Sequence, residues 1–283
     1  MSQIDVNAYL KRVGYRGPLA PEFELLKSLQ CHHTAAIPFE SLDPLLGRPV
    51  NIDPASLEKK LIRGGRGGYC FEQNGLFFHA LSALDFAVTP LAARVRWTLP
   101  ADAPQTPLSH MLLMVVLQDG EFICDVGFGG QSPTVPLRLA SEIEQETPHG
   151  TYRLRGDGAC YELEMRLSDT WATMYRFSRE PQSFRDYEVF NWYTSTYPSS
   201  RFVNNLVAAR VTAGGRLTLF NDELTLQRPD GRREHRLLGG AAEVRDVLTR
   251  DFGIRIGRAE IDSIWPRLPK RTGTDAAKTT SNR

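Results

Sequence analysis

One cysteine stands between a glycine-rich segment and a predicted helix, in the stretch GGRGGYCFEQNGLFFHAL from Gly64 to Leu81. A free cysteine there can be a small, inert core residue. It can also be a nucleophile, because unpaired N–H groups and the dipole at a helix N-terminus favour a thiolate. Cys70 is therefore a candidate for covalent catalysis if the chain also supplies a base and a group that orients this base.

The candidate base is His110, which stands where the loop PADAPQTPLS meets an apolar strand pattern. Loop ends on a rigid sheet are usual places for reactive groups. His79 shares the predicted helix of Cys70, but nine residues at about 100° each place it on the opposite side and about 13 Å along the axis. His79 is therefore interpreted as structural.

The candidate orienting group is Asp125, a carboxylate within the apolar segment FICDVGFGG. Carboxylates are seldom buried without a partner, and a histidine would be such a partner. The alternative is an aspartate that caps a turn at the end of the strand.

The strand register is compatible both with a His110–Asp125 pair and with an aspartate that only caps a turn. With a two-residue Asp119-Gly120 loop, Asp125 lies opposite Met114, about 13 Å along the strand from His110. A four-residue loop places it opposite Leu112, at the diagonal distance of about 7–8 Å from His110. A three-residue loop would put the two side chains on different faces.

If the His–Asp pair forms, the three residues make a complete catalytic set. Cys70 is the nucleophile, His110 removes its proton, and Asp125 fixes the tautomer of the imidazole. The chain order Cys, His, acid is that of papain-like enzymes.

The elements that must hold these residues fall into three parts. Residues 1–85 read as a helical bundle, with Asp53 and Pro54 opening one helix and another running from near Cys70 to about Ala83. Residues 86–200 read mainly as short antiparallel strands of a small barrel or sandwich, followed by a polar, aromatic-rich connection over 186–205. Residues 201–283 mix strands with a helix and end in a polar tail from Pro266, which we expect to fray. The expected fold class is α+β.

The composition narrows the functional classes. A net charge of +1 gives no reason to expect a nucleic-acid or membrane partner, and the longest apolar run, Met111 to Leu117, is too short to cross a bilayer. The start of the chain does not read as a signal peptide, so we expect a cytoplasmic protein. The four cysteines are far apart and form no CxxC pair, which favours reduced thiols and no metal site.

Taken together, the motifs RGGYCFEQN, SHMLL and DVGFGG resemble those of the bacterial arylamine N-acetyltransferases. The segments AIPFESLDPLLGRPV, TWATMYRF and FVNNLVAARV extend the resemblance to about residue 260. The resemblance implies a helical bundle, a β-barrel and an α/β lid, with a Cys70–His110–Asp125 triad. It also implies ping-pong transfer from acetyl-CoA, as co-substrate and with no tightly bound cofactor, to an arylamine, arylhydrazine or heteroaromatic amine.

The resemblance also implies roles for residues around the triad. Arg66 and Glu40 match a charged pair that braces the cysteine loop; the alternative is two solvated surface charges. The remaining expected positions line the cleft: Thr106 and Ser109 before the histidine, Gly127, Gly129 and Gly130 beside the CoA, Phe128 as an aromatic wall, and Phe71 as a residue that tunes the acceptor pocket.

Two other functions remain open at this stage. A thiol hydrolase or transglutaminase-like enzyme could use the same triad, although GYCFEQ lacks the small-residue and tryptophan setting of papain-type cysteines. A binding module that keeps the fold without catalysis is the second alternative, and the presence of all three triad residues argues against it.

Overall fold

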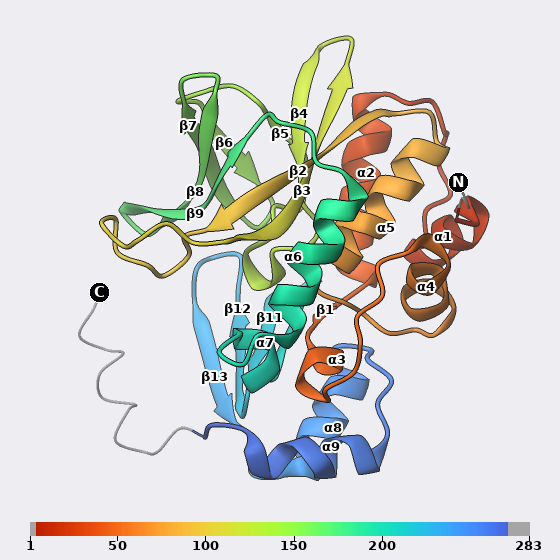
Figure 1. Cartoon of the computed structure of the whole chain (residues 1–283), viewed down its shortest axis with the longest axis vertical. Helices are drawn as coiled ribbons and strands as arrows, with labels where there is room; N and C mark the ends of the chain where they lie inside the picture. Colours follow the sequence, from red (N-terminus) through yellow and green to blue (C-terminus); the bar gives the residue numbers. More distant parts are fainter. Residues whose placement is uncertain (1–3, 271–283) are drawn as a thin grey trace.

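The computed structural model describes residues 4–270 and contains three packed regions (Figure 1). The predicted α+β class is confirmed: helices lead, a curved antiparallel sheet follows, and a second sheet with helices ends the described chain. The exact domain boundaries remain predictions. No helix among the described residues is long and apolar enough to span a membrane.

The N-terminal region is helical because its apolar residues recur at helical spacing and its caps are placed correctly. Asp53 opens α4 by accepting a hydrogen bond from the backbone N–H of Ser56 at 3.0 Å. The helix predicted to start at Asp53 and Pro54 is α-helical only at first, and it continues as a π-helical segment over Glu58–Arg63. The elements of this region are α1 (Val6–Val13), α2 (Phe23–Ala36), α3 (Leu42–Leu45), α4 (Pro54–Leu57), η1 (Glu58–Arg63) and α5 (Cys70–Ala83).

Helix α5 begins at Cys70, as predicted, because a side chain of its first turn caps the backbone just before it. The side chain of Glu72 accepts a hydrogen bond from the backbone N–H of Tyr69 at 3.1 Å and so caps the first turn. Just upstream, a Cβ on Gly67 would lie 2.0 Å from the carbonyl oxygen of Pro38. Only glycine lets the loop pass this close to the backbone of the neighbouring segment.

The central region is one antiparallel sheet of eight strands that curls into a nearly closed barrel, in the order β5-β4-β3-β2-β9-β8-β7-β6. A core of apolar side chains from β2, β3, β7, β8 and β9 fills its interior. The strands are β2 (Ala87–Val95), β3 (Leu108–Leu117), β4 (Gly120–Cys124), β5 (Leu137–Arg138), β6 (Glu144–Thr147), β7 (Gly150–Gly156), β8 (Cys160–Leu167) and β9 (Thr170–Ser178).

The segment expected as a polar connection over 186–205 is mainly helical, so this prediction was wrong. It forms α6 (Phe184–Thr196) and α7 (Arg201–Asn204). Ser183 and Asp186 make a reciprocal capping box at the start of α6, which satisfies the first backbone N–H groups despite the β-favouring aromatic residues. Figure 1 shows α6 running from beside α5 and the barrel toward α7 and the C-terminal sheet.

The C-terminal region is a five-stranded antiparallel sheet in the order β1-β10-β11-β12-β13, covered by helices. Its edge strand β1 (Phe39–Glu40) comes from the N-terminal region and pairs with Ala208 and Ala209 of β10. The other elements are β10 (Val207–Thr212), β11 (Gly215–Phe220), β12 (Glu223–Gln227), β13 (Arg233–Leu237), α8 (Ala241–Arg250), α9 (Arg258–Ile264) and η3 (Trp265–Arg267).

The start of the polar tail packs against the protein. Leu268 is buried, and the Arg267 guanidinium donates to the carbonyl oxygen of Leu45 at 3.1 Å. The rest of the predicted fraying tail, 271–283, lies outside the described residues.

Candidate active site

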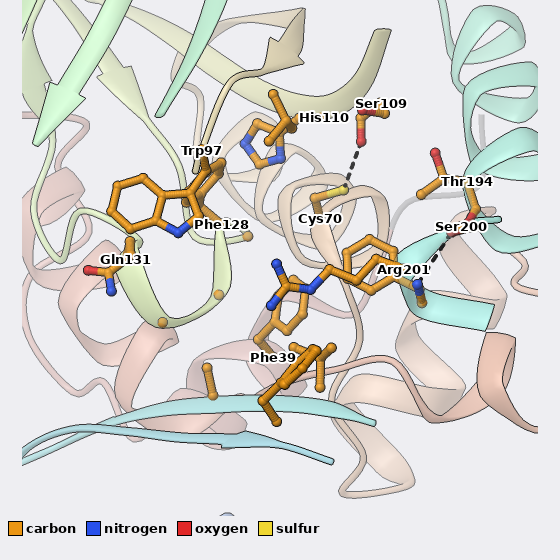
Figure 2. Close-up of a pocket in the computed structure, with 18 of the residues that line it drawn as sticks. Phe39, Cys70, Trp97, Ser109, His110, Phe128, Gln131, Thr194, Ser200 and Arg201 are labelled. Atoms are coloured by element: carbon orange, nitrogen blue, oxygen red, sulfur yellow. Dashed lines mark hydrogen bonds between the residues drawn. The ribbon is translucent and has the colours of Figure 1, made fainter. Parts of the chain in front are cut away.

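Cys70 is the first residue of α5 and faces the barrel strand that carries His110. Its side chain is buried, and its Sγ donates a hydrogen bond to the carbonyl oxygen of Ser109 at 3.6 Å (Figure 2). The thiol therefore already lies beside the residue that precedes the candidate base. A Cβ on Gly127 would lie 2.8 Å from the Cα of Cys70, so the glycine segment after β4 can approach Cys70 only without a side chain.

His110 and Asp125 form a direct pair. The distance between His110 Nε2 and Asp125 Oδ2 is 2.7 Å, and both side chains are buried. Strand β3 pairs with β4 so that Leu113 faces Cys124, which brings Asp125 to the diagonal position from His110. This is the register in which Asp125 lies opposite Leu112, although the turn itself holds only residues 118 and 119.

The second carboxylate oxygen of Asp125 is also fully used. Its Oδ1 accepts hydrogen bonds from Asn74 Nδ2 at 3.0 Å and from the backbone N–H of Gly127 at 2.8 Å. Asn74 additionally accepts from the backbone N–H of Val126 at 3.0 Å. Sequence reasoning missed Asn74, although its position four residues after Cys70 places both on one face of α5.

The electrostatics of this pair favour a charged imidazole. Burial alone would lower the pKa of His110, but the adjacent Asp125 carboxylate outweighs it and raises this pKa well above the ordinary value for histidine. The Cys70 side chain acts in the same direction. Burial opposes ionisation of Asp125, yet His110 and Asn74 together hold its pKa below the usual range.

A buried group of charged residues lies around the loop that leads into Cys70. Arg66 lies 2.7 Å from Glu40 and 3.4 Å from Asp43, while Lys60 bridges Asp43 at 2.5 Å and Glu72 at 2.6 Å. Glu40 and Arg66 are therefore paired and largely removed from water, which excludes the alternative of two solvated surface charges. Three carboxylates face two cations in this cluster. Burial raises the pKa of Glu72 to about 7 against the opposing effect of Lys60.

A cavity of about 460 Å³ opens beside Cys70 and His110. Five of the expected cleft residues line it: Ser109, Gly127, Phe128, Gly129 and Gly130. Figure 2 shows Trp97 and Phe128 on one side of the cavity, with Phe39 and Arg201 below the cysteine. Sequence reasoning missed several other lining residues, because they come from distant elements: Phe39, Trp97, Tyr193, Arg201, Phe202 and Phe220.

Two residues expected at this cleft lie elsewhere. Thr106 lines a different hollow on the barrel, and its hydroxyl donates to the carbonyl oxygen of Val95 at 2.8 Å. Phe71 points into the core, where its ring packs against those of Tyr69 and Tyr187. Neither is among the residues that line the cavity.

The donor set suits acyl chemistry on sulfur. Within 4–270, no group of three or more His, Cys, Asp or Glu side chains is arranged to hold a metal ion. What the site does offer is a thiol, a histidine held by a carboxylate, and an aromatic cavity that opens onto both.

Comparison with known proteins gives a consistent result. Residues 22–261 match the profile of the N-acetyltransferase family. The arylamine N-acetyltransferase of Mycobacterium tuberculosis is 41% identical, covering 96% of this chain and 99% of its own length, and that of Escherichia coli is 39% identical over 90% of each chain.

The fold is similar to solved structures as well. The structure of the Mycobacterium marinum arylamine N-acetyltransferase superposes with a TM-score of 0.90 at 39% identity, covering 93% of this chain and 99% of that one. A structure of the M. marinum enzyme in complex with CoA also gives a TM-score of 0.90, at 38% identity over 94% of this chain and 100% of that one. This chain therefore belongs to the arylamine N-acetyltransferase family.

Proposed function

We propose that this enzyme moves an acetyl group from acetyl-CoA to the amine of an arylamine, arylhydrazine or heteroaromatic amine, through a thioester on Cys70. The observation that carries the proposal is the juxtaposition of the thiol with a histidine held 2.7 Å from a buried carboxylate, beside an aromatic cavity. The names of the relatives support the acceptor class, and the CoA complex of the M. marinum relative supports the donor.

In the first half-reaction, His110 holds the proton of Cys70 as an imidazolium beside the thiolate, as its raised pKa favours. The sulfur attacks the acetyl carbonyl carbon, a new C–S bond forms, and the C–S bond to CoA breaks. His110 returns the proton to the departing CoA thiolate.

In the second half-reaction, the nitrogen of the acceptor attacks the acetyl-Cys70 carbonyl. The C–S bond to Cys70 breaks, His110 receives the proton lost by the amine, and the cysteine is regenerated. Because the donor product leaves before the acceptor reacts, one cavity can serve both substrates in turn. Asp125 keeps the imidazole proton on Nε2, so that the other ring nitrogen is available to the sulfur and to the amine.

The surrounding residues take supporting roles in this proposal. Phe128 offers a wall on which a flat acceptor ring can stack, and Gly127, Gly129 and Gly130 let the protein backbone approach a substrate closely. The Arg66–Glu40 pair holds the loop that leads into α5. In domain terms, residues 1–85 supply the nucleophile, 86–200 supply His110 and Asp125, and 201–283 form a lid.

The cellular setting belongs to the same proposal. All four cysteines are free in the structure, which fits a reducing compartment, and we place the reaction in the cytoplasm.

Mass spectrometry after incubation with acetyl-CoA tests the mechanism. We expect one acetyl adduct, mapped to Cys70, that disappears when an arylamine is added. Cys70→Ser should form no thioester and no acetylated amine while it keeps the fold. An adduct on Cys31, Cys124 or Cys160 would refute the assignment, and turnover of peptide rather than acetyl-CoA would indicate a thiol hydrolase.

A further inference from the structure

Arg201 lines the cavity beside Cys70 and is permanently charged, whereas most of the other described lining residues are aromatic, apolar or uncharged. It is the first residue of α7, and the described lining contains no aspartate, glutamate or lysine. Cys70 and His110 also line the cavity, and the raised pKa of His110 makes it a second positive group. The described lining therefore presents positive charge and no carboxylate to a ligand.

The guanidinium of Arg201 is not paired with a carboxylate of the described residues. Among residues 4–270, no acidic side chain lies within 4.0 Å of it, whereas Arg66 is held by Glu40 at 2.7 Å. Its contact is with an aromatic face: the guanidinium carbon lies 4.7 Å from the centre of the Phe220 ring. Arginine offers five N–H donors in a fixed planar arrangement that matches a carboxylate. No residue within 4–270 accepts a hydrogen bond from these donors.

The direction of the side chain is also informative. Figure 2 shows the guanidinium of Arg201 reaching from α7 into the middle of the cavity, on the side of Cys70 and above Phe39. The surrounding protein atoms lower its pKa through desolvation, without bringing a compensating anion. A cation in such surroundings gains most from a ligand that carries a negative group.

We infer that Arg201 binds an anionic group of the substrate and selects aromatic acceptors that carry a ring carboxylate. This inference rests on the proposed function. The aromatic walls hold the ring, the amine faces acetyl-Cys70, and the carboxylate meets the guanidinium. Phosphates of CoA are the other source of negative charge. The pantetheine arm separates them from the reacting thiol, whereas Arg201 lines the same 460 Å³ cavity as Cys70.

The test compares a charged and a neutral acceptor of the same shape. The enzyme is first acetylated with 4-nitrophenyl acetate, which carries no phosphate, and is then supplied with 4-aminobenzoate or 4-aminobenzamide. In Arg201→Gln, the ratio of kcat/KM for the benzoate over the benzamide should fall about 10- to 100-fold, because a charge-assisted hydrogen bond is lost. Arg201→Lys, which keeps the charge but not the planar donors, should lose less.

A matched control removes an arginine outside the cavity. Arg185 lies on α6 with its side chain exposed and paired with Glu188 at 3.1 Å, so Arg185→Gln should leave the ratio unchanged. An unchanged ratio in Arg201→Gln would overturn the inference. So would slower acetylation of Cys70 by acetyl-CoA alone, since that result assigns the arginine to the phosphates. A wild-type enzyme that acetylates neither amine would instead contradict the proposed function.

Discussion

Replacing Asp125 with asparagine tests the proposed mechanism at one pair of atoms. Oδ1 of Asp125 accepts two hydrogen bonds, from Asn74 and from the backbone of Gly127, so the oxygen of the new amide must occupy this position. The amide nitrogen then replaces Oδ2 and points a donor at His110 Nε2, 2.7 Å away in the wild type. Nε2 can accept this hydrogen bond only if the imidazole proton moves to the other ring nitrogen.

The consequence is a histidine in the wrong tautomer. The nitrogen that should take the proton of Cys70 now carries one itself, and the positive charge of the imidazolium loses its buried counter-charge. We expect acetyl transfer to fall by up to about 10⁴-fold, as in other triads. Stability should change less, by about 1.5–3 kcal/mol, because one charge-assisted hydrogen bond is weakened while the cost of burying a carboxylate is relieved.

Both quantities can be measured on one protein. CoA release with an arylamine reports the activity, and urea unfolding reports the free energy of unfolding. Asp119→Asn is a matched control, since Asp119 lies on the turn between β3 and β4 with an exposed side chain. If Asp125→Asn keeps most of its activity and loses only about 1 kcal/mol, the residue caps a turn and the reasoning fails.

Two further predictions concern pH. His110 keeps its proton well above neutral pH and faces the sulfur, so iodoacetamide should alkylate Cys70 at pH 6. The His110→Ala variant should lose this reactivity in acidic buffer. If Cys70 of the wild type reacts only above about pH 8, and the variant behaves in the same way, the ion pair is refuted. Glu72 has its pKa raised from 4.5 to about 7, so its contribution to stability is present below 4.5 and is lost as pH rises through 7. Urea unfolding should therefore show a decrease on the order of 2–3 kcal/mol across this range, which Glu72→Gln removes and the exposed Glu24→Gln does not.

The parts of the site that follow the chain locally were predictable. Glycines place the start of α5 near Cys70, and the loop and strand patterns identify His110 and Asp125 as candidates. The register between them was not predictable, because it depends on which residues close the β3–β4 turn. The cap of α6 at Ser183 was present in the sequence, but the aromatic residues that follow it obscured the helix.

The cavity was less accessible to sequence reasoning. Its walls combine Phe39 from the first region, Trp97 from the barrel and Phe220 from the last sheet, and no local pattern links residues this far apart. Phe71 and Thr106 were expected at the cleft because the family resemblance implies roles for the positions beside Cys70 and before His110. Helix geometry instead turns Phe71 into the core, and strand geometry turns Thr106 toward a second hollow on the barrel.

The pairing of β1 with β10 has a consequence for the order in which the enzyme can mature during synthesis. Phe39 must find Ala209, 170 positions later, and closing a loop of that length costs about 4.5 kcal/mol of chain entropy. The adjacent Glu40 holds Arg66 on the loop that leads into the nucleophile. Glu40 and Arg66 are both synthesised early, but a ribosome-bound chain that already contains the cysteine, the histidine and the aspartate still lacks β10 and β11, whose residues line the cavity beside Cys70.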